Sequence, residues 1–82
     1  MIIHNTNELA LLVKQQRKKM SLNQSDIGSQ VGLQQKTVSA FENNPAATKL
    51  ETLFKLLSAA DLEVRIQPKN TPKDSDQWQE EW

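Results

Sequence analysis

Cysteine is absent from this sequence of 82 residues, so no disulfide bond can stabilise the fold. A chain of this length forms one domain at most and buries only a modest hydrophobic core. It therefore needs another source of stability, which we expect a second copy of the chain to supply. The absence of cysteine also suits a reducing compartment.

Long hydrophobic runs are absent as well, because charged or amide side chains interrupt every apolar stretch. Residues 1–5 lack the basic lead and the apolar segment of a signal peptide. No stretch is long and apolar enough to predict a transmembrane helix. We therefore expect a cytoplasmic protein with no membrane partner.

The groups that enzymes and metalloproteins need are also missing. The sequence contains no glycine-rich phosphate loop, and no base stands beside a plausible nucleophile. His4 is the single histidine and has no cysteine or carboxylate at ligand spacing. The sequence thus predicts no catalytic residue, no metal site and no cofactor.

Net charge is zero, but the charges are unevenly distributed. Residues 1–36 carry five basic and two acidic side chains, whereas residues 37–82 carry five basic and eight acidic ones. A basic front half and an acidic rear half indicate two different contact surfaces. The alternative interpretation is an ordinary mixed surface.

Apolar residues at helical spacing predict four helices. The first covers residues 6–19, with Thr6 as its N-cap, and the second follows a capping box formed by Asn23 and Asp26. Gly32 ends the second helix, and residues 35–42 form the third. Thr48 is expected to cap the fourth, whose apolar stripe consists of Leu50, Leu53, Leu56 and Leu57.

The hydrophobic period changes to two after the fourth helix, which predicts one strand over residues 62–68 with Leu62, Val64 and Ile66 on one face. No second strand is predicted in the chain, although the backbone groups of a strand need partners. The simplest solution is pairing with the same strand of a second copy across a two-fold axis. Residues 1–68 then form the domain, and residues 69–82 form a polar tail.

The second and third predicted helices together form a helix-turn-helix. Gly28 permits close approach of the two helices, and the residues that lock them together are Ile27, Val31, Val38 and Phe41. The outer face of the third helix is then free to enter a DNA major groove. The fold class is therefore all-α, with four helices and one C-terminal strand that pairs across a homodimer.

The polar residues of this outer face are the candidates for reading base edges: Gln34, Gln35, Lys36 and Ser39. Glutamine can pair bidentately with adenine, lysine can reach guanine, and serine can contact either. Four further residues are candidates for phosphate contact: Gln24, Lys14, Lys18 and Asn43. The alternative for both sets is a solvated face without a function.

The residues from Arg17 to Asn43 resemble the phage-repressor-like (XRE) helix-turn-helix family in order and spacing. Their pattern is Arg-x6-Gln-x2-Ile-Gly-x2-Val-Gly-x5-Val-x2-Phe-Glu-Asn. The match covers residues 9–57. The resemblance implies a partly buried ion pair between Arg17 and Glu42 that joins the first and third helices. Asn44 departs from the glycine common in the family, but asparagine tolerates the same backbone shape.

Three further features make the chain similar to HipB-type antitoxins. They are the sequence Thr-Val-Ser-Ala-Phe-Glu-Asn-Asn-Pro over residues 37–45, the strand predicted after the fourth helix, and the final Glu81-Trp82. That resemblance implies a strand-paired homodimer that represses its own operon at a two-fold symmetric operator. It also implies a partner, a HipA-type serine/threonine kinase toxin, for which Trp78 and Trp82 are the candidate contacts. The alternatives are a regulator without a toxin partner and a protein-interaction module with a vestigial helix-turn-helix.

Overall fold

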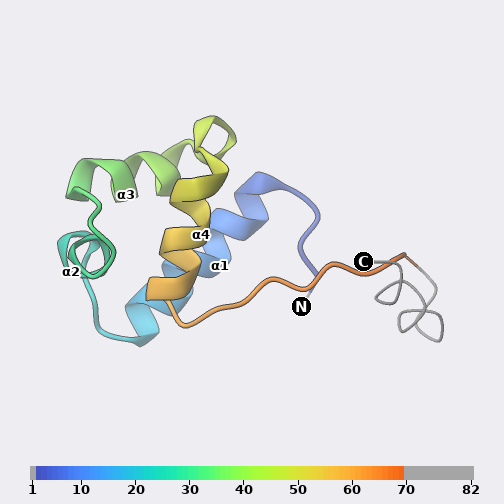
Figure 1. Ribbon diagram of the computed structural model, residues 1–82, viewed down its shortest axis with the longest axis horizontal. Helices are drawn as coiled ribbons and strands as arrows, with labels where there is room; N and C mark the ends of the chain where they lie inside the picture. Colours follow the sequence, from blue (N-terminus) through green and yellow to red (C-terminus); the bar gives the residue numbers. More distant parts are fainter. Residues whose placement is uncertain (1, 70–82) are drawn as a thin grey trace.

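The computed structural model describes residues 2–69, which form four α-helices and one short 3₁₀ helix (Figure 1). The elements in chain order are α1 (Thr6–Lys19), α2 (Gln24–Ser29), α3 (Gln35–Asn43), η1 (Pro45–Ala47) and α4 (Leu50–Ala59). The expected all-α fold with four helices is confirmed. No helix in this part of the chain is long and apolar enough to cross a membrane.

The capping box predicted for α2 is present. The side chain of Asn23 accepts a 2.7 Å hydrogen bond from the backbone N–H of Asp26, and the backbone N–H of Asn23 donates to Asp26 Oδ2 at 3.0 Å. These reciprocal bonds satisfy two of the backbone donors that the first turn of a helix leaves free. They therefore fix where α2 begins.

The expected caps of α1 and α4 are wrong by one residue. Asn5 caps α1, because it has the extended backbone of an N-cap and its side chain accepts from the N–H of Glu8 at 2.8 Å. Thr48 closes η1 instead, donating its N–H to the carbonyl of Pro45, and Lys49 precedes α4 without a side-chain cap bond. Asn5 and Thr6 are both good capping residues, and the local backbone decides between them, whereas Thr48 is already used by η1.

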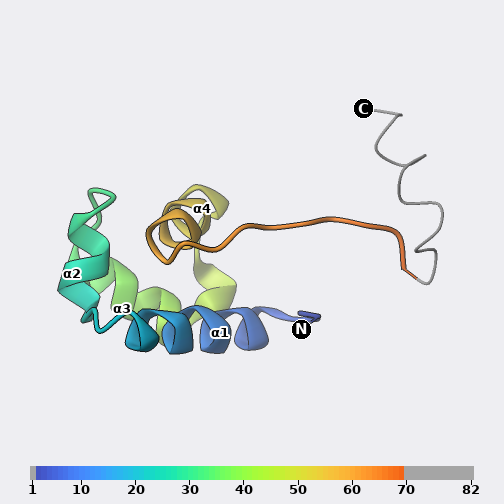
Figure 2. The same cartoon turned by 90° about the horizontal axis from the view of Figure 1, so that it is seen from below.

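Each α-helix contributes to one hydrophobic core. Figure 2 shows α1 along one side of the helical body and α4 on the other, with α2 at one end. The largest fully buried side chains come from all four helices and are Val13, Ile27, Val38, Phe41 and Leu56. Burying one such side chain stabilises a fold by about 1.5–3 kcal/mol. The core thus fixes the position of α3 relative to the rest of the domain.

Leu62, just after α4, is half-buried against the core, and the chain beyond it runs away from the helical body as far as residue 69 (Figures 1 and 2). No strand pairing forms within residues 2–69, so this part of the chain offers no ladder partner to the strand expected at residues 62–68. Val64 and Ile66 are exposed. Trp78 and Trp82, the candidate toxin contacts, lie outside the described residues.

Candidate nucleic-acid interface

The corner between α2 and α3 depends on two glycines. A Cβ atom at Gly28 would lie 2.7 Å from the carbonyl oxygen of Leu33 and 3.1 Å from Cγ2 of Val38, so only glycine allows this close approach. Gly32 has a φ of +73°, in the left-handed region that glycine adopts at no steric cost. Val31, expected in the interior, is half-buried at the edge of the core. The two helices thus form a tight helix-turn-helix.

The residues expected to read bases lie at the start and on the outside of α3. Gln34 is the N-cap residue and is exposed, as are Gln35 and Lys36 in the first turn. Ser39 is half-buried and accepts a hydrogen bond from Asn43 Nδ2 at 3.2 Å, one turn further along α3. The structure therefore leaves these side chains, and that of Asn43, wholly or partly exposed along α3.

Arg17 of α1 and Glu42 of α3 form the ion pair that the resemblance implied. Arg17 Nε lies 2.8 Å from Glu42 Oε2, and Arg17 Nη2 donates to Glu42 Oε1 at 3.1 Å. The two side chains are only 9% and 3% exposed. Arg17 Nη1 also donates to the carbonyl of Leu22, in the link between α1 and α2, at 2.9 Å. One guanidinium group thus joins α1, the α1–α2 link and α3.

The charged form of Glu42 is stabilised in the fold. Burial alone would raise the pKa of its carboxyl group, but hydrogen bonds from Arg17 and Gln24 and the positive charges of Arg17 and Lys14 hold that pKa below its usual value. Lys14 was expected to contact phosphate. It is half-buried in α1, and its charge acts on Glu42.

Gln24 connects this ion pair to the surface of α3. Its Nε2 donates to Glu42 Oε1 at 3.1 Å, and its Oε1 accepts a 2.6 Å hydrogen bond from Nε2 of Gln35. The sequence predicted phosphate contact for Gln24 and base contact for Gln35, but it did not predict the bond between them. Gln24 and Gln35 are 11 positions apart, so a bond between them can be predicted only when the angle between α2 and α3 is known.

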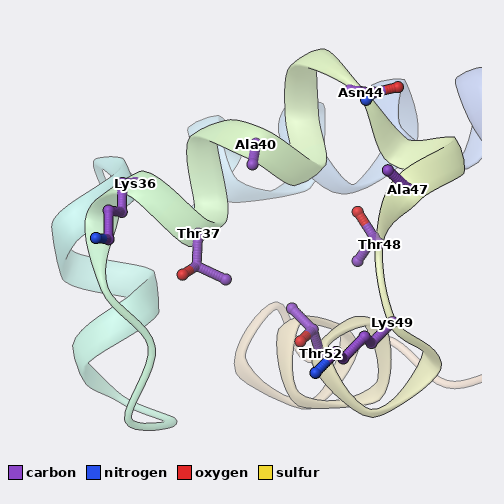
Figure 3. A pocket seen from close by; sticks show the side chains of 8 residues that line it. All are labelled: Lys36, Thr37, Ala40, Asn44, Ala47, Thr48, Lys49 and Thr52. Atoms are coloured by element: carbon purple, nitrogen blue, oxygen red, sulfur yellow. The ribbon is translucent and has the colours of Figure 1, made fainter.

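An open groove lies between α3 and α4, beside Lys36 of α3 (Figure 3). Lys36, Thr37 and Ala40 form its α3 wall, and the other lining residues are Asn44, Ala47, Thr48, Lys49 and Thr52. Sequence reasoning missed this groove, although Lys36 and Ala40 are one helical turn apart. Lys18, the remaining phosphate candidate, is exposed in the last turn of α1.

Comparison with known proteins agrees with this geometry. The helix-turn-helix family model matches residues 13–66. The antitoxin HipB of Escherichia coli K12 is 35% identical over 82 residues, which cover 98% of this chain and 93% of that protein. HipB of Escherichia coli O6:H1 is also 35% identical, over 98% of this chain and 87% of its own length.

Solved structures of HipB have the same fold. HipB in a HipA-HipB-O2-O3 complex superposes with a TM-score of 0.82 at 33% identity, covering 85% of this chain and 99% of that one. HipB in an O4 20mer complex gives a TM-score of 0.81 with the same identity and coverage. The similarity extends over nearly the full length of the two HipB antitoxins. The chain therefore belongs to the helix-turn-helix family and, within it, to the HipB antitoxins.

Proposed function

We propose that this chain is a sequence-specific DNA-binding autorepressor and an antitoxin that binds a HipA-type serine/threonine kinase toxin. The observation that carries the DNA-binding part is the chain of hydrogen bonds from the buried Arg17–Glu42 pair through Gln24 to the exposed Gln35. The relatives support both partners, since their solved structures include HipB bound to HipA and to O-site 20mers.

Base readout is the proposed role of the outer face of α3. Gln35 stands in the first turn of α3, where the N-terminal residues of a recognition helix meet base edges. Its amide is already held by Gln24, so less side-chain freedom is lost on binding than for a free glutamine. Gln34, Lys36 and Ser39 complete the proposed base-reading set.

Phosphate contact is the proposed role of Gln24, Lys14, Lys18 and Asn43. The amide nitrogen of Gln24 has two hydrogens, and only one is needed for the bond to Glu42, so the second is free for a phosphate oxygen. Lys18, near the end of α1, and Asn43, at the end of α3, are both exposed, and Lys14 adds positive charge near Glu42. Such contacts fix the register of a protein on the duplex.

Homodimer formation through residues 62–68 is the third part of the proposal. Leu62, Val64 and Ile66 alternate with polar residues, and the last two are 47% and 76% exposed. Pairing this segment with its copy would cover these side chains and supply the backbone partners that residues 2–69 do not. A two-fold dimer then presents two α3 helices to half-sites whose centres are about 34 Å apart, or a multiple of that.

The remaining parts of the proposal concern the tail and the site of action. Residues 1–68 form the DNA-binding and dimerising domain, and residues 69–82 form a tail that contacts the toxin through Trp78 and Trp82. A protein that represses transcription and restrains a kinase would work in the cytoplasm. The alternatives to the antitoxin role are a regulator without a toxin partner and a pure interaction module.

Two measurements test the proposed function. Fluorescence anisotropy compares binding to the duplex upstream of the chain's own gene with binding to a shuffled duplex of equal length. We expect a preference of at least about 1000-fold at physiological salt. Pull-down with the product of the adjacent gene then tests the toxin partner. Equal binding to both duplexes would support the alternative of a protein-interaction module. Operator binding without binding to a kinase would support the alternative of a regulator that has no toxin partner.

A further inference from the structure

The outer face of α3 extends beyond the side chains assigned to base readout. A residue four positions after Lys36 lies one turn further along the same helix face. That residue is Ala40, whose side chain is exposed, whereas the side chain of neighbouring Ser39 is half-buried. Ala40 is therefore an exposed side chain on the same face of α3 as Lys36.

The surroundings of Ala40 favour the approach of nucleic acid. Figure 3 shows Ala40 on the α3 wall of the groove, pointing into it beyond Lys36 and Thr37, with Lys49 on the opposite side. None of the eight residues that line the groove is acidic, and two are lysines. The groove thus attracts an anionic backbone and leaves the methyl group of Ala40 open to a base edge.

We propose that Ala40 reads the C5-methyl group of a thymine and is a further specificity-determining residue of the recognition helix. The proposal rests on the DNA-binding function proposed above. The side chain of alanine has no hydrogen-bond donor or acceptor, so it can distinguish bases only through apolar contact. The thymine methyl group is the apolar group that the major groove displays, and alanine is a residue that contacts it.

The competing explanation is that alanine stands here because it is the best helix former. Thymine-to-uracil scanning separates the two explanations, since uracil lacks only the methyl group. The probe is the duplex upstream of the chain's own gene, in which deoxyuridine replaces each thymine in turn. Anisotropy with the full-length protein measures the affinity for each duplex.

We expect one thymine in each half-site whose replacement weakens binding of the wild type about fourfold, the effect of losing one buried methyl group. Ala40→Gly should bind the unmodified duplex about fourfold more weakly per half-site, and uracil at that position should weaken its binding no further. Ser58→Gly is the matched control, because it places a glycine at an exposed position of α4. It should keep the full uracil effect.

Two results overturn the proposal. One is a wild type that tolerates every thymine replacement, and the other is an equal uracil effect in wild type and Ala40→Gly. Neither result contradicts the proposed function. That function predicts a preference for the operator over shuffled DNA, regardless of which residue contacts the thymine methyl groups. Loss of that preference in the wild type is the distinct sign that DNA recognition itself is wrong.

Discussion

Arg17 and Glu42 are 25 positions apart in the sequence, yet their side chains meet through two hydrogen bonds of 2.8 and 3.1 Å. Both side chains are buried, so neither charge can turn to water if the other is removed. The pair therefore has two consequences: it holds α3 against α1, and it makes the stability of the domain depend on the charge of Glu42.

Glu42→Ala should lower the free energy of unfolding by about 3–5 kcal/mol, because it leaves the charge of Arg17 buried without a partner. Urea unfolding at neutral pH measures the loss. Glu51→Ala is the matched control, since Glu51 faces Lys55 across 3.8 Å on the exposed side of α4 and should matter little. Equal free energies of unfolding for Glu42→Ala and the wild type would contradict a structural role for the pair.

The same pair predicts how stability depends on pH. The pKa of Glu42 is lower in the folded chain than its ordinary value of 4.5, so the folded state favours the ionised carboxylate. This contribution is fully present above the unfolded-state pKa and is lost as pH falls through the folded-state pKa. Unfolding free energies from neutral pH to below 4.5 should fall more steeply for the wild type than for Glu42→Ala. Parallel curves would assign the acid sensitivity to other carboxylates.

Gln35 and Gln24 should act together in operator binding. Gln35→Ala should weaken specific binding by about 1–3 kcal/mol and leave binding to shuffled DNA nearly unchanged. Gln24→Ala releases the amide of Gln35, so its effect should be smaller when Gln35 is already alanine. A double-mutant cycle by anisotropy measures this coupling. Equal losses on operator and shuffled duplexes would show that Gln35 does not read a base.

The sequence predicted features that depend on local chemistry. The capping box of Asn23 and Asp26 follows from spacing, and the φ of +73° at Gly32 follows from the backbone preference of glycine. The expected end of α2 at Gly32 is wrong, because α2 ends at Ser29 and Gly32 lies in the turn that follows. The pairing of Arg17 with Glu42 came from the family resemblance and could not come from spacing. The Gln24–Gln35 bond and the groove between α3 and α4, which depend on the relative placement of the helices, were missed.

The missed features show what decides between local alternatives. Asn5 and Thr6 are both good capping residues, and the bond to the N–H of Glu8 selects the first. The Gln24–Gln35 bond requires the angle between α2 and α3, which the packing around Gly28 sets. The groove beside Ala40 requires the position of α4.

Val64→Pro tests the proposed dimer strand. Proline removes a backbone donor from the ladder and fixes φ, so we expect loss of the dimer and, with it, of operator binding. Val64→Thr is the control, because it keeps the branched side chain and the backbone N–H. Sedimentation velocity measures the oligomeric state. An unchanged profile for Val64→Pro would move the interface elsewhere, with the exposed Leu50 and Phe54 of α4 as the next candidates.

Deletion of residues 78–82 tests the proposed toxin contact. Trp82 combines a large apolar ring with an N–H donor, and tryptophan is a frequent hot-spot residue of protein interfaces. Glu80 and Glu81 before it favour a basic partner surface and speed its approach. The alternative is a solvated tail with no partner.

The truncated chain should separate the two activities. Operator binding should survive, because the deletion leaves α2, α3 and residues 62–68 intact. Affinity for the kinase toxin, measured by calorimetry, should fall by at least about 1.4 kcal/mol, a tenfold step. Trp82→Ala in the full-length chain should account for much of that loss if the indole is the anchor, because few residues carry most of the binding energy of an interface. An unaltered toxin affinity after the deletion would place the contact on the helical domain and leave DNA binding untouched.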